Sequence, residues 1–207
     1  VMWIGILWYF NFVQIPNMGK IPDEQKPAIT GVIAPSALFW FRWGAMSTIV
    51  TGLILAWLNG YIVDAIAIGL TDGVPKHSAI GIGMWLGSIM WFNVWFIIWP
   101  NQKIMIGLTE GDKTVAGPKA ALASRTNTLL SLPMLYFMVA SIHGLAASGG
   151  VWASVSTPAL IIGLAIIVVI EANAIWGKML GLIQSVSGVI TSSIVLTIIM
   201  AGIVNYM

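Results

Sequence analysis

Long apolar stretches separated by short polar segments make up most of the chain. Hydrophobic windows predict six membrane helices, most of them close to the roughly 20 residues that cross about 30 Å of hydrocarbon. The expected spans are 1–15, 36–58, 78–99, 119–145, 157–176 and 180–206. Little chain is left for a water-soluble region. We therefore expect residues 1–207 to form a single all-α domain, a polytopic transmembrane helix bundle.

Two prolines mark expected helix ends. The first helix is short because the chain starts at Val1 inside an apolar run, so we expect it to lack its beginning, and we expect it to stop at Pro16. Further along, Trp91, Trp95 and Trp99 recur every four residues, which is typical of an aromatic belt at the headgroups. Pro100 is expected to end that helix as it leaves the membrane.

Composition supports a bilayer environment. The chain is 58% hydrophobic and only 8% charged, and it contains eleven Trp, whereas soluble domains carry roughly 25% charged residues. It has no Cys, which excludes thiolate metal sites, c-type haem attachment and disulfides. The net charge of +2 is too small to indicate a nucleic-acid partner.

The basic residues indicate an orientation. If each span crosses the membrane, only Lys76 falls on one side, and the other side carries Lys20, Lys26, Arg42, Lys103, Lys113, Lys119, Arg125 and Lys178. Short basic loops are retained in the cytoplasm. We therefore expect both termini of this multi-pass protein outside, with segment 61–70 on the outer membrane surface.

Four stretches resemble a known family in their order. They are WIGILWYF (3–10), LFWFRWGAMSTIVTGLIL (38–55), WFNVWFIIWPNQKIM (91–105) and SRTNTLLSLPMLYFMVASIHG (124–144). Together, over about residues 1–145, they resemble the membrane part of the bacterial membrane-bound urate hydroxylases, the urate oxidase N-terminal membrane domain. The resemblance implies a redox protein of the bacterial inner membrane, in a short form without the family's c-type cytochrome domain.

The resemblance also implies a substrate site near the cytoplasmic surface. Its catalytic residues would be Arg42, Asn101, Gln102 and Asn127, because guanidinium and amide groups suit a planar, oxygen-rich anion such as urate. Where the family's pattern has His-Asn-Asn, this chain has Arg125, Thr126 and Asn127, so only Asn127 is carried over. The alternative is that Arg42 and Arg125 are snorkelling, positive-inside residues.

His143 is the candidate metal ligand and cofactor-binding residue. It lies near the outer end of the fourth expected span, where it would supply one axial nitrogen to a b-type haem, and a residue upstream of Val1 would supply the other. The alternative is a hydrogen bond to a neighbouring helix. His77, in a loop, is expected to be an exposed surface residue.

Glu171 is the acidic residue placed well inside an expected span. A charge at mid-membrane costs about 2.5 kcal/mol or more, so we expect this carboxyl group to be protonated, paired or in a wet cavity. A proton-handling role is one hypothesis. The alternative is a structural hydrogen bond, with Asn173 or Gln184 as candidate partners.

Two functional hypotheses remain open. The first is a urate hydroxylase-like oxidoreductase in which haem b passes electrons to an outer c-type cytochrome. The second is a non-catalytic integral membrane subunit of a larger respiratory or oxygenase complex, with other membrane subunits and the lipid bilayer as its partners. A channel or transporter is a weaker third hypothesis, because a charged pair at mid-membrane on broken helices is absent from the sequence.

Overall fold

The computed structural model describes residues 1–143, 156–178 and 180–206, and within them every regular element is helical. The N-terminal half contains α1 (Met2–Trp8), η1 (Tyr9–Gln14), α2 (Ile15–Asn17), η2 (Met18–Lys20), α3 (Lys26–Ala28), η3 (Ile29–Ile33), α4 (Ala34–Leu58) and α5 (Ile62–Ile66). The remainder contains α6 (Pro75–Phe92), η4 (Asn93–Ile98), α7 (Trp99–Met105), α8 (Lys113–His143), α9 (Thr157–Trp176), η5 (Gly181–Ile183) and α10 (Val186–Tyr206). The predicted all-α fold class is confirmed.

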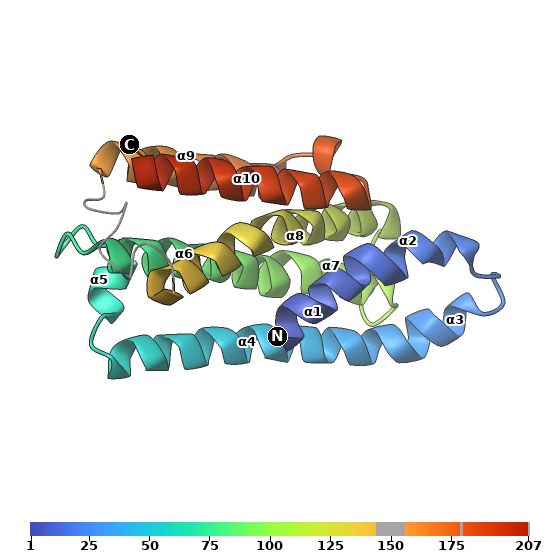
Figure 1. Ribbon diagram of the computed structural model, residues 1–207. Helices are drawn as coiled ribbons and strands as arrows, with labels where there is room; N and C mark the ends of the chain where they lie inside the picture. Colours follow the sequence, from blue (N-terminus) through green and yellow to red (C-terminus); the bar gives the residue numbers. More distant parts are fainter. Residues whose placement is uncertain (144–155, 179, 207) are drawn as a thin grey trace.

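The helices run side by side along one axis and reverse direction at each end (Figure 1). One end holds the turn between η2 and α3, the turn between α7 and α8, and the turn between α9 and α10. The opposite end holds α5 and the C-terminus. This arrangement matches the alternation on which the predicted topology depends.

Three helices continue past prolines, and two of these prolines, Pro16 and Pro100, were expected to end their helices. The first continues through Pro16 to Lys20, the second already begins at Lys26, and the third runs unbroken from Pro75 to Met105 through Pro100. The predicted ends at Pro16, Ser36 and Trp99 are therefore wrong. In each case a π-helical turn ends two residues before the proline: η1, η3 and η4.

The π-helical turns give the physical reason. A proline in an α-helix lacks an N–H donor and its ring clashes with the carbonyl group four residues earlier. A π-turn is one residue wider than an α-turn, so it moves that carbonyl away and lets the helix continue. The chain thus keeps long helices through Pro16, Pro35 and Pro100.

The other predicted spans need smaller corrections. The fourth helix begins at Lys113, six residues before the expected Lys119, and is described to His143, so residues 144 and 145 lie outside the described part. The fifth matches its prediction, Thr157–Trp176. The expected sixth span divides into the 3₁₀ turn η5 and α10. In segment 61–70, only Ile62–Ile66 is helical.

The centre of the bundle is α8, which is buried on all sides from Leu122 to Ser131. It packs against α6, η4 and α7 on one side and against α10 on another. Among the described residues, four helical stretches are long and apolar enough to cross a membrane: Lys26–Leu58, Pro75–Met105, Thr157–Trp176 and Val186–Val204. α8 is as long but more polar, so its neighbours must shield it from lipid.

The orientation of the bundle can be tested with cysteines, because the natural chain contains none. Glu110 and Leu70 are exposed and lie in connections at opposite ends of the bundle. We expect Glu110→Cys to react with a membrane-impermeant maleimide only after cells are opened, and Leu70→Cys to react in intact cells, because the basic end is retained in the cytoplasm. The reverse labelling pattern would show that the orientation is inverted.

Candidate functional site

A hydrogen-bonded network of three polar side chains crosses the interior of the bundle. Asn93 in η4 and Asn127 in α8 are completely buried. The Asn93 Nδ2 atom donates to Asn127 Oδ1 at 2.9 Å and to Glu171 Oε2 of α9 at 3.0 Å. Asn127 Nδ2 donates to the carbonyl oxygen of Met90 at 2.8 Å. One amide therefore joins three helices.

The network leaves two acceptor atoms unused. Asn93 Oδ1 and Glu171 Oε1 are buried and have no hydrogen-bond partner among the described residues. Buried polar atoms are nearly always paired, so this pair of oxygens is a place where a proton or a water would be stabilised. Glu171 is hydrogen-bonded as expected, and the donor that the structure shows is Asn93.

Other polar residues of α8 pair with the first and last helices. Asn11 Nδ2 donates to Ser124 Oγ at 2.8 Å, and Trp8 Nε1 donates to Ser131 Oγ at 3.1 Å. On another side, Ser193 Oγ donates to the carbonyl oxygen of Leu129 at 2.6 Å. These bonds fix α1, η1 and α10 against the central helix.

A second polar cluster lies near the end of the bundle with most basic residues. The guanidinium carbon of Arg42 on α4 lies 3.3 Å from the ring centroid of Trp99 on α7, and Lys103 Nζ lies 5.9 Å from the same centroid. We call Arg42, Trp99 and Lys103, together with Gln102 one turn after Trp99 on α7, the Trp99 cluster. Two cations thus share one aromatic ring, a cation–π arrangement.

The Trp99 cluster has unpaired hydrogen-bonding groups. Arg42 Nη1 and Gln102 Oε1 are buried without a hydrogen-bond partner in the described part of the chain. Two ion pairs are present among the described residues, Lys26–Asp23 and His77–Asp72, and neither includes Arg42 or Lys103. An anion would satisfy Arg42 Nη1, and an N–H group on the same ligand would satisfy Gln102 Oε1.

The predicted catalytic residues therefore lie in two places. Arg42 and Gln102 belong to the Trp99 cluster. Asn101 lies on the same helix as Trp99, and its Nδ2 atom donates to the carbonyl oxygen of Ile97 at 2.7 Å. Asn127 belongs to the interior network. Arg125 is 9% exposed, and its Nη1 atom has no partner among the described residues.

Sequence reasoning missed Asn93, which holds the network together. The available signal was a single amide side chain inside the aromatic run WFNVWF. A polar residue at that depth in a membrane helix requires a partner within the bundle. The sequence around Asn93 could indicate that this amide has a hydrogen-bond partner. The identity of the partner depends on which helices pack together.

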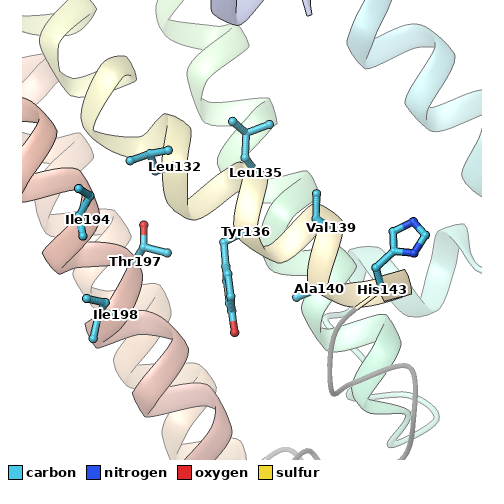
Figure 2. A pocket seen from close by; sticks show the side chains of 9 residues that line it. All are labelled: Leu132, Leu135, Tyr136, Val139, Ala140, His143, Ile194, Thr197 and Ile198. Carbon is cyan, nitrogen blue, oxygen red and sulfur yellow. The ribbon is translucent and has the colours of Figure 1, made fainter.

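His143 is exposed at the C-terminal end of α8 and lines one end of a groove of about 590 Å³ between α8 and α10. Figure 2 shows the Tyr136 side chain extending into this groove, while the His143 ring points away from α10. The other histidine, His77, is paired with Asp72. The described residues thus place no second imidazole opposite His143. They do not by themselves assemble a bis-histidine haem site, for which the second axial nitrogen was expected from a residue upstream of Val1.

One family model matches this chain. Its description is urate oxidase N-terminal, and it matches residues 60–201. The chain belongs to the urate oxidase N-terminal family. Comparisons with curated proteins and with solved structures gave no match.

The matched range refines the predicted resemblance, which was placed at about residues 1–145. Asn93, Asn127 and Glu171 all lie inside the range 60–201, as do Trp99 and Gln102. Arg42 lies before it. The interior network therefore belongs wholly to the part of the chain that defines membership in the urate oxidase N-terminal family.

Replacing Asn93 with Leu tests the network. The change leaves Asn127 Oδ1 and Glu171 without their donor, and each unpaired buried group costs about 1–3 kcal/mol. Unfolding in mixed detergent micelles, followed by Trp fluorescence, measures the loss of stability.

Asn59→Leu is the matched control. The Asn59 side chain is exposed and donates to the Leu55 carbonyl of the preceding helical turn, so we expect its replacement to change the free energy of unfolding by no more than about 0.5 kcal/mol. Glu171→Gln keeps an acceptor for Asn93 and should also be tolerated. Equal losses for Asn93 and Asn59 would contradict the network's structural role.

Haem binding by His143 stays a prediction. If the full chain binds haem b through this residue, His143→Ala is expected to remove the reduced-minus-oxidised absorption bands of the purified protein, and His77→Ala is expected to leave them. Helix insertion should survive the change because it depends on apolar length. Bands that persist in His143→Ala, or a wild-type protein without bands, would contradict the prediction.

Proposed function

We propose that this member of the urate oxidase N-terminal family is a membrane oxidoreductase that binds urate, or a closely related planar purine anion, at the Trp99 cluster. The observation that carries the proposal is the stacking of Arg42 on Trp99, together with a buried guanidinium N–H that has no partner among the described residues. Family membership supports urate as the substrate class.

The chemistry of the cluster suits such a ligand. Urate is flat, anionic and edged with carbonyl and N–H groups. A guanidinium group pairs with neighbouring oxygens through a planar fork of donors, and the Gln102 amide oxygen accepts from a ring N–H. Trp99 and its two cations provide positive charge that no described carboxylate neutralises. The cluster therefore favours an anion over a neutral purine.

Glu171 is the proposed proton-handling residue. Hydroxylation of urate by water adds one oxygen atom and releases two protons and two electrons. A carboxyl group with one oxygen held by Asn93 and the other unpaired can accept and return a proton without a large rearrangement. The electrons would pass to a partner outside this site, for which a c-type cytochrome is our proposal.

A non-catalytic membrane subunit is the second candidate, and Asn127 favours it. Both ends of the Asn127 amide are used inside the bundle, where Oδ1 accepts from Asn93 and Nδ2 donates to Met90. The carried-over residue of the family's pattern thus has a structural role. In this alternative the chain keeps the scaffold and packs in a larger respiratory or oxygenase complex.

Urate binding separates the two candidates. Equilibrium dialysis of labelled urate against the full chain in nanodiscs is expected to show saturable binding, and Arg42→Gln should weaken it about tenfold to a hundredfold, since a hydrogen bond to a charged group contributes about 1.5–3 kcal/mol. Arg42→Lys should recover only part of the affinity because ammonium lacks the planar fork.

Lys113→Gln is the matched control, because it removes a positive charge from an exposed site at the same end of the bundle. We expect it to leave urate binding unchanged. No saturable binding by the wild-type protein would favour the scaffold alternative. Equal weakening by Arg42→Gln and Lys113→Gln would show that urate senses only the general positive charge.

A further inference from the structure

The connection between α5 and α6 brings three potential metal ligands together at the end of the bundle opposite the Trp99 cluster. Asp64 lies in α5, Asp72 in the loop, and His77 in the first turn of α6. One ligand atom from each lies within 4.8 Å of the other two. We propose that Asp64, Asp72 and His77 form a binding site for a divalent transition-metal ion of the zinc class.

The ligand types set the class of metal. An imidazole nitrogen and two carboxylate oxygens suit Zn²⁺ and neighbouring first-row ions, whereas Ca²⁺ prefers oxygen ligands alone. Ligand atoms around a tetrahedral Zn²⁺ with bonds of about 2.0–2.2 Å lie roughly 3.5 Å apart. Small side-chain rotations would therefore close the present arrangement around an ion. Water would occupy the remaining coordination position.

Each carboxylate has one oxygen held by a neighbouring donor. Thr71 Oγ1 donates to Asp64 Oδ1 at 2.6 Å, and the backbone N–H of Val74 donates to Asp72 Oδ1 at 3.1 Å. Asp64 Oδ2 is left as the ligand atom, and Asp72 Oδ2 already faces His77 Nδ1 at 2.5 Å. Such outer hydrogen bonds orient metal ligands and tune their affinity.

The supporting helices are rigid where the ligands are attached. α5 packs closely on α6 because Gly81 has no side chain there: a Cβ would lie 2.2 Å from the Ala65 carbonyl oxygen. Trp85 Nε1 donates to the Ile66 carbonyl at 3.0 Å, and the Tyr61 ring stacks on His77 with centroids 5.8 Å apart. The ligands therefore start from a preorganised geometry.

Ser78 provides a further observation at the loop. It is 1% exposed, and its hydroxyl oxygen has no hydrogen-bond partner among the described residues. A Cβ added to Gly69 would lie 2.4 Å from this hydroxyl, so the loop passes directly against the first turn of α6.

Metal titration of the full chain in detergent tests the site. After chelator treatment, isothermal titration with Zn²⁺ is expected to show one site per chain, and Co²⁺ is expected to give the visible d–d bands of a coordinated ion. His77→Gln and Asp72→Asn should each weaken Zn²⁺ binding at least tenfold. Thr71→Ala, which frees Asp64 Oδ1, should weaken it about tenfold or more.

His143→Gln is the matched control, because it removes an exposed imidazole outside the loop. It is expected to keep the Zn²⁺ affinity and the Co²⁺ bands. Circular dichroism checks that each variant remains helical, so that a loss of binding is not a loss of fold. Weak binding that is equal in the wild type and the loop variants would overturn the proposal and leave His77–Asp72 as a simple ion pair. Binding lost only in His143→Gln would also overturn it.

Discussion

The structure depends on pairing the polar side chains of α8 inside a membrane protein. A bilayer offers no water to an unpaired amide or hydroxyl, so each such group needs a partner from another helix or from its own backbone. α8 carries Ser124, Asn127 and Ser131 at its buried centre, and they pair with η1, η4 and α1 respectively. Lipid could replace apolar contacts between α8 and its neighbours at a lower cost in free energy than it could replace these hydrogen-bonded pairs.

The π-helical turns contribute to the same solution. η1 and η4 carry Asn11 and Asn93, the two amides that bond to α8, and each turn precedes a proline in its helix. A π-turn widens the helix locally and rotates the residues that follow it. One π-turn therefore accommodates the proline and also carries the amide that faces α8. The helix continues past the proline, and the amide can bond to a side chain of α8.

The sequence predicted the all-α bundle, because apolar length is a property of single segments. It did not predict that helices pass Pro16 and Pro100, because a proline is normally a stop and the compensating π-turn depends on packing. Glu171 was identified as a residue that needs a partner, but Asn93 was not identified as that partner. Pairing between helices is a property of the assembled bundle, so residues 78 positions apart give no local signal.

The two ends of the bundle differ in how their charges are balanced. Around Trp99, Arg42 and Lys103 are cations without a described carboxylate partner, whereas at the α5–α6 loop Asp64 and Asp72 face one imidazole. The first end has excess positive charge, whereas at the second end Asp64 and Asp72 outnumber the one cation, Lys76, among the described residues of the α5–α6 connection. Opposite charge is therefore favoured at each: an anion at the Trp99 cluster and a cation at the loop. Between them, the Asn93 network holds the Glu171 carboxyl group inside the bundle, where a charge is poorly solvated. A hydrogen bond from the Asn93 amide satisfies one of its oxygens there without a counter-charge.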